Sequence, residues 1–137
     1  MPLAPEDLLA IQELYARYNH AIDFGDVEAW VATFTPDGAF ATNMSAPAAG
    51  AEQLRALGTV LAARLDSRHW TNNLIIEAAP GGARGICYLA LLRPGNSTRP
   101  AALPATGIYR DELVKGADGW RFKSRNATLE GAPPMKD

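Results

Sequence analysis

The first regular pattern of apolar residues predicts an amphipathic helix over residues 5–23. One apolar stripe recurs at spacings of three and four, formed by Leu8, Ile11, Tyr15, Tyr18 and Ile22. Pro5 followed by two acids suits the first turn of such a helix. At about 100° per residue, Asp23 falls on the edge of the stripe with Asn19, while His20 lies nearly opposite it. We therefore expect a half-buried Asp23 carboxylate and a solvated His20.

Two shorter helices are predicted before the strands begin. Gly25 is a natural end for the first helix, and Asp26 can cap a second one over residues 27–34. Residues 35–38 have the composition of a turn, residues 39–42 form a brief strand, and small residues at 43–50 indicate a loop. A third helix is expected over residues 51–66, with Gly58 as its weak point.

The second half of the chain reads as four strands. They are expected at residues 69–78, 84–93, 106–115 and 120–129, with turns at 80–82 and 116–119 and an irregular connection at 94–104. The second of these is apolar almost throughout, which indicates a central strand covered on both faces. Helices followed by a run of strands predict a single α+β domain over residues 1–137. The expected shape is a cone-like half-barrel, in which three helices pack on a curved, mostly antiparallel sheet and enclose a pocket.

Composition excludes several classes of protein. The formal net charge is −2 and the pI is about 5.7, so neither a nucleic acid nor a membrane surface is an expected partner. Cys87 is the only cysteine, which rules out an internal disulfide, and two histidines without an acidic cluster make a metal site unexpected. The sequence contains no glycine-rich phosphate loop after a strand, so a nucleotide cofactor is not expected. Without a basic leader or an apolar run of about 18 residues, a cytoplasmic protein is expected.

Four segments carry a resemblance to a known family. They are RYNHAIDFGDVEAWVATFTPDGAF near the start, RHWTNNLIIE, GARGICYLALL, and TGIYRDELVKGADGWRFKSRNATLEG near the end. Together with the order of elements, they resemble the SnoaL-like branch of the nuclear transport factor 2-like superfamily over nearly the whole chain. The resemblance implies the cone-shaped fold, and association as a homodimer or homotrimer through the outer face of the sheet.

Within that superfamily, the catalytic positions look most like scytalone dehydratase and hexachlorocyclohexane dehydrochlorinase. Those enzymes use an aspartate at the end of the first helix and a histidine at the start of the strand after the third helix, which correspond to Asp23 and His69. The dehydrochlorinase arginine corresponds to Arg125, but its helix-one lysine is replaced by Tyr18. Scytalone dehydratase has a tyrosine where Ile22 stands, and its second histidine is missing here. Neither enzyme's full set of catalytic residues is present.

An aspartate–histidine pair suits proton abstraction beside an activating group. The imidazole removes the proton, while the carboxylate orients the ring and stabilises the imidazolium. Loss of water or a halide from the adjacent carbon would complete a cofactor-independent elimination. Tyr18 or Arg125 could hydrogen-bond a developing oxyanion. A cavity lined by Trp30, Phe34 and Phe40 would prefer a small hydrophobic or aromatic substrate.

Strand alternation leaves two of these side chains open to a different interpretation. His69 alternates onto a mixed polar face with Thr71, and only a bulge near residues 71–73 would change that parity. Arg125 shares its side with Lys123, opposite Phe122, so alternation favours a solvated, charged face for this arginine.

Two other functions stay open. In ketosteroid isomerase-like proteins, the resemblance implies a helix-one tyrosine as the oxyanion donor, and Tyr18 occupies that place. The isomerase base would fall near Asn43, which cannot act as a base. The second alternative is a non-catalytic protein, either a binder of small molecules or an assembly partner resembling the small subunit of ring-hydroxylating dioxygenases.

Overall fold

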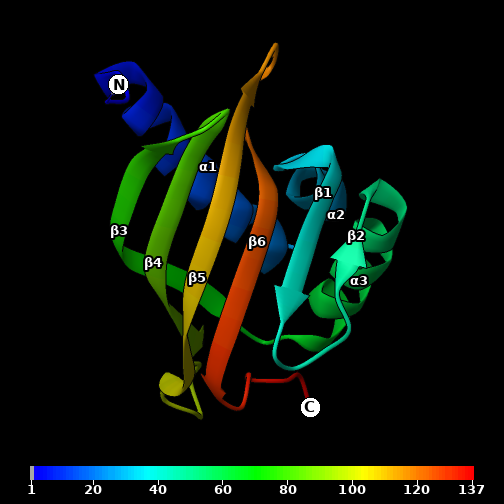
Figure 1. Ribbon diagram of the computed structural model, residues 1–137. Coiled ribbons are helices and arrows are strands. Elements are labelled where there is room, and N and C mark those ends of the chain that lie inside the picture. The colour runs from blue at the N-terminus through cyan, green and yellow to red at the C-terminus, as the bar shows by residue number, and fades with distance from the viewer. Residues whose placement is uncertain (1) are drawn as a thin grey trace.

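The computed structural model describes residues 2–137, which fold into helices packed against one curved sheet (Figure 1). The elements in chain order are α1 (Pro5–Asp23), α2 (Val27–Val31), β1 (Phe34–Thr42), β2 (Ala48–Ala49), α3 (Ala51–Arg64), β3 (Arg68–Ala79), β4 (Gly82–Arg93), β5 (Ala102–Gly116) and β6 (Gly119–Gly131). The six strands lie in the order β2-β1-β6-β5-β4-β3.

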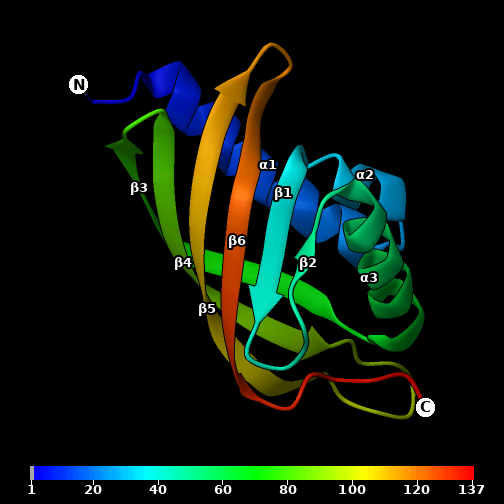
Figure 2. The ribbon, with the colours of Figure 1, turned by 45° about the vertical axis from the view of Figure 1, so that its right-hand side comes forward.

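The sheet is antiparallel except at one junction. Strands β3 to β6 form a meander of antiparallel neighbours, β1 pairs with β6 in parallel, and β2 pairs antiparallel with β1. Helix α1 runs across one face of the curved sheet, and α3 closes the side near β1 and β2 (Figure 2). The predicted α+β, cone-like architecture is therefore confirmed.

The start of β1 differs from the prediction. The second helix ends at Val31, and the segment expected to be a turn belongs to the strand, because Phe34 pairs with Phe122 on β6. The register then shifts between Phe34 and Ala39. Pro36 lies within this irregular stretch, where its missing N–H removes no bond from a regular ladder.

Other predicted boundaries also move by a few residues. The third helix ends at Arg64, two residues earlier than predicted, and the predicted loop at 43–50 contains β2. The connection after β4 is shorter than predicted, since β5 begins at Ala102. No helix within residues 2–137 combines the length and the apolar character needed to cross a membrane.

Aromatic side chains from both layers form the centre of the core. Trp30 and Phe34 are almost fully buried, with their ring centroids 5.3 Å apart in an edge-to-face arrangement. Tyr18 of α1 and Phe122 of β6 complete the cluster at a centroid distance of 5.7 Å. Edge-to-face pairs of this kind add about 0.5–1.5 kcal/mol beyond the burial of their area. This cluster fixes α1 and α2 against the sheet.

Gly58, expected only to weaken α3, has a packing role. A Cβ atom at this position would lie 2.9 Å from Cε3 of the buried Trp30 ring. We expect Gly58→Ala to lower the free energy of unfolding, because overpacking costs about 1–3 kcal/mol and outweighs the roughly 0.5–1 kcal/mol that alanine gains in a helix. Urea denaturation followed by circular dichroism would measure the change. Ala56→Gly, at an exposed position of α3, calibrates the helix-propensity contribution alone, and a more stable Gly58→Ala protein would contradict this account.

Candidate functional site

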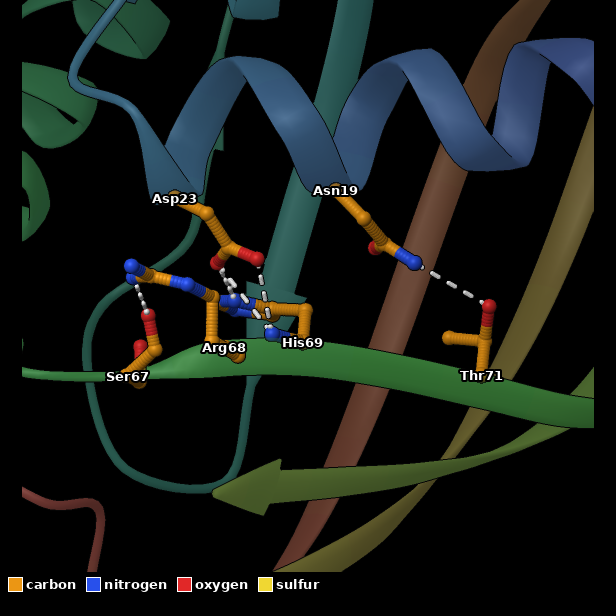
Figure 3. Close-up of polar contacts among 6 residues, drawn as sticks. All are labelled: Asn19, Asp23, Ser67, Arg68, His69 and Thr71. Carbon is orange, nitrogen blue, oxygen red and sulfur yellow. Dashed lines mark hydrogen bonds and ion pairs between the residues drawn. The ribbon is translucent and has the colours of Figure 1, made fainter. Parts of the chain in front are cut away.

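The two residues expected to act together are in direct contact. Nδ1 of His69 lies 2.6 Å from Oδ1 of Asp23 (Figure 3). The backbone N–H of His69 also donates to the same carboxylate, at 3.0 Å to Oδ2 and 3.2 Å to Oδ1. Both side chains are shielded, with exposed fractions of 6% for Asp23 and 8% for His69. The carboxylate therefore holds the ring and the backbone of His69 at once.

Matching spacings on α1 and β3 create this contact. Asn19 lies one turn before Asp23 on α1, and its Nδ2 donates to Oγ1 of Thr71 at 3.1 Å (Figure 3). Four residues of helix advance about 6 Å, and two residues of strand advance about 6.6 Å. The pairs Asn19–Thr71 and Asp23–His69 are therefore in register along the helix–strand interface.

A β-bulge brings His69 to the inner side of the sheet. The register of β3 against β4 shifts by one residue between Asn72 and Ile75, and Asn73 adopts a positive φ of 55°. Before the bulge, His69 and Thr71 are partly buried; after it, the partly buried positions change parity. Simple alternation between Ile75 and His69 therefore predicted the wrong face of the sheet for the His69 side chain. The alternative, a bulge near residues 71–73, is confirmed.

His69 forms part of the wall of an apolar cavity of about 320 Å³ between the helices and the sheet. Tyr18, Ile22 and Phe40 contribute to the wall from α1 and β1. The remaining lining residues are mainly aliphatic and come from the end of β1 and the segment after it, from α3, β4, β5 and β6, and from the C-terminal segment. His69 is thus placed beside a space suited to a small hydrophobic molecule.

Trp30 and Phe34, expected to line this cavity, lie outside its wall. Trp30 is fully buried beneath Tyr18 and Phe34 is 2% exposed, both within the aromatic core. Of the three predicted aromatic lining residues, only Phe40 reaches the cavity. The other two support its floor from below.

Arg125 occupies a different environment from the one that alternation favoured. It is 1% exposed, and Nε donates to Oδ1 of Asp111 at 3.0 Å while Nη2 donates to Oδ2 at 3.3 Å. A register shift opposite Leu113 of β5 makes Lys123 the extra residue in β6. The parity of the strand changes there, so Phe122 and Arg125 both face inward. The expected solvated face was wrong for Arg125.

The buried Arg125 guanidinium lies among aromatic rings and outside the cavity wall. Its Cζ atom is 3.5 Å from the ring centroid of Tyr109 and 4.2 Å from that of Tyr18, two residues that do line the cavity. Tyr15 donates a hydrogen bond to Asp111 from the other side. Arg125 is therefore placed to act on a ligand only through the tyrosines that cover it.

A family model described as the SnoaL-like domain matches residues 4–126. The chain belongs to this family. Among solved structures, a protein of unknown function with a cystatin-like fold from Nostoc punctiforme is 28% identical over 98% of each chain, with a TM-score of 0.85. The function-unknown protein Rv3472 of Mycobacterium tuberculosis is 29% identical over 93% of this chain and 76% of its own, with a TM-score of 0.81.

A third structure holds a ligand. A protein from Catenulispora acidiphila, solved in complex with S-DNPA, is 29% identical over 89% of this chain and 92% of its own, with a TM-score of 0.78. No match was found among curated proteins. These similarities confirm the SnoaL-like branch of the nuclear transport factor 2-like superfamily.

Burial changes the acid–base properties of several groups in this SnoaL-like domain. Burial raises the pKa of Tyr18 and Tyr109 above the ordinary tyrosine value, so both stay protonated and able to donate. Burial also raises the pKa of Asp111, against the opposing effect of the Arg125 charge. The Cys87 thiol, with a pKa raised to about 11 by burial, is a neutral core group.

Two of these residues had not been expected at the site. Tyr109 lines the cavity and Asp111 pairs with Arg125, although neither stood out as a candidate. A signal was present in β5, where Asp111 lies between Tyr109 and Leu113 on the alternate positions that face inward. A single carboxylate on an otherwise apolar face needs a buried partner.

The remaining polar groups do not suggest a metal or a second base. Within residues 2–137, no cluster of three or more His, Cys, Asp or Glu side chains could hold a metal ion. Asn43, at the position where an isomerase base would fall, accepts from the N–H of Leu129 at 2.8 Å and donates to its carbonyl at 3.0 Å. Its amide therefore ties the end of β1 to β6.

Proposed function

We propose that this SnoaL-like domain is a cofactor-independent lyase that eliminates water from a small hydrophobic or aromatic molecule. The observation that supports this most directly is the 2.6 Å contact between His69 and Asp23 in the wall of an apolar cavity. The catalytic roles follow from the chemistry of that pair. His69 is the general base and Asp23 is its orienting partner.

The hydrogen bonds favour one tautomer of His69. An ionised carboxylate only accepts hydrogen bonds, so Nδ1 must carry the proton that points at Asp23. Nε2 then keeps its lone pair and is the ring nitrogen available to a substrate. The negative charge of Asp23 also stabilises the imidazolium that forms when Nε2 takes up a proton.

The proposed reaction starts from a carbonyl compound with a hydroxyl group on its β-carbon. Nε2 of His69 removes the proton from the α-carbon, and the electron pair of the broken C–H bond becomes part of an enolate. Collapse of the enolate forms the C=C bond and breaks the C–O bond. The departing hydroxide takes the proton back from the imidazolium, which yields water and restores neutral His69.

The cavity and the relatives support the substrate class. Apolar walls from Ile22, Phe40 and the aliphatic residues of α3 favour a compact hydrophobic body. Tyr18 offers a hydroxyl to an oxyanion, as a buried and protonated phenol. SnoaL-like proteins of this fold include dehydratases and hydroxylase-like proteins, and the Catenulispora relative was solved in complex with S-DNPA.

An isomerase remains the second candidate, because Tyr18 lies in the cavity wall together with His69. In that case His69 would return the proton to a different carbon of the same molecule, and no water would leave. Asn43 does not support an isomerase, since its side-chain amide forms two hydrogen bonds with the backbone of Leu129.

The test is a product analysis with the wild-type protein. We expect a panel of aromatic-fused cyclic β-hydroxyketones to give conjugated enones, whose absorbance rises during the reaction and whose mass is lower by one water. A β,γ-unsaturated ketone panel run in parallel reports isomerisation, in which the mass is unchanged. Turnover of the second panel alone would replace the lyase with an isomerase. Binding without turnover of either panel would indicate a non-catalytic small-molecule binder.

A further inference from the structure

The cavity has an identifiable mouth, formed where its lining side chains are exposed. Met44, Val60 and Met135 are all cavity-lining residues, yet 46–55% of each is exposed to solvent. Tyr18 and Tyr109, in contrast, are each 2% exposed. The exposed residues therefore surround the entrance and the tyrosines form the floor. Three large apolar side chains that would otherwise be unexplained on the surface belong to this entrance.

Arg64 is also part of this entrance. It is an exposed residue of the last turn of α3, and it is among the residues that line the cavity. The C-terminal segment fixes its backbone, because the N–H of Lys136 donates to the Arg64 carbonyl at 2.7 Å. A second bond runs from the N–H of Asp66 to the carbonyl of Pro134 at 3.0 Å. The base of the Arg64 side chain is thus held in place at the mouth.

The charge of Arg64 is not matched by a nearby acid. Arg55, on the same helix, forms an ion pair with Glu28 at 2.6 Å, and Asp66 forms an ion pair with Arg99 at 2.9 Å. Within residues 2–137, Arg64 takes part in no ion pair, and the cavity lining contains no Asp or Glu. A basic residue suits the end of a helix through the helix dipole, but that effect does not require it to border a cavity.

We infer that the substrate is an amphiphilic acid, with an apolar body in the cavity and a carboxylate at the mouth beside Arg64. This inference deepens the proposed function and rests on it for the reaction at the buried end. A guanidinium can bind a carboxylate through two parallel N–H···O bonds. The apolar body, enclosed by the aliphatic wall, then brings its reactive carbon to His69. The acid is the only part of the molecule that remains in contact with water.

Two nearly isosteric probes test the inference without any turnover. Isothermal titration calorimetry would compare 1-naphthylacetate with its neutral amide, 1-naphthylacetamide, which differ mainly in charge. We expect the acid to bind about 3- to 10-fold more tightly at low salt, the range for a partly exposed charge pair. The preference should shrink in 1 M NaCl, where the Debye length is about 3 Å. Arg64→Gln should remove the preference and leave the affinity for the amide unchanged.

Matched variants separate this contact from general effects. Arg84→Gln makes the same change of charge at an exposed position of β4, outside the cavity lining, and should keep the preference for the acid. Arg64→Lys should retain part of it. Equal binding of acid and amide by the wild-type protein, or no binding of either, would overturn the inference. Elimination is tested separately. If the protein dehydrates neutral ketones but shows no preference for acids, the proposed lyase activity stands and only the inference about the acid is overturned.

Discussion

Replacing His69 with alanine should lower kcat/KM for the elimination by about 10²–10⁴-fold, the usual contribution of a positioned general base. The variant loses Nε2, the ring nitrogen that takes up the proton, while the cavity wall loses only one partly buried side chain. Steady-state kinetics on the β-hydroxyketone that the wild-type protein converts best would measure the loss. Circular dichroism and urea denaturation would show that the fold is kept.

The chain offers a matched control for that variant. His20 is the other histidine of the sequence and is an exposed residue of α1 outside the lining of the apolar cavity, so His20→Ala should leave kcat/KM unchanged. Asp23→Asn should lower kcat with a smaller effect on KM, because an amide can accept from the backbone of His69 but cannot stabilise the imidazolium by charge. Full activity in either the His69 or the Asp23 variant would remove the proposed mechanism.

The helix that carries Asp23 could be predicted from the sequence because its signals are local. Apolar spacing, the early proline and the glycine break mark α1, and the structure begins and ends it at Pro5 and Asp23. The meander of β3 to β6 is likewise marked by its turns. The pairing of Asp23 with His69 came from a resemblance to known dehydratases, since 46 residues separate the two in sequence.

The directions of His69 and Arg125 were harder to predict, and the cause is the same for both. Each follows or precedes a β-bulge, at Asn73 in β3 and at Lys123 in β6, and one extra residue reverses the face that every later side chain occupies. Asparagine tolerates a positive φ, so Asn73 left a trace in the sequence. The bulge at Lys123 could not be predicted from the sequence, because an exposed lysine is equally compatible with a bulge and with a regular alternating strand.

The polar centre of the core leads to a large expected effect on stability. Asp111→Asn should lower the free energy of unfolding by about 3–5 kcal/mol, the usual result of leaving one member of a buried ion pair without its partner. Arg125 has a side chain with 0% exposure, stays charged at any pH at which the protein folds, and would keep only a neutral amide opposite it. Urea denaturation at pH 7 would measure the loss, which is a large part of the 5–15 kcal/mol typical of a folded domain.

The size of that effect depends on burial, and two further variants test the dependence. Asp118→Asn removes a carboxylate that is 82% exposed and lies 3.6 Å from Arg121, so it should leave the free energy of unfolding nearly unchanged. Replacing both partners, in Asp111→Leu with Arg125→Met, should recover most of the stability that Asp111→Asn loses, because no buried charge is then left without a partner. If Asp111→Asn were as stable as Asp118→Asn, the Arg125 charge would have to be relieved by another group. The packing around Tyr18 and Tyr109, which form the cavity floor, would then be able to rearrange around the uncompensated charge.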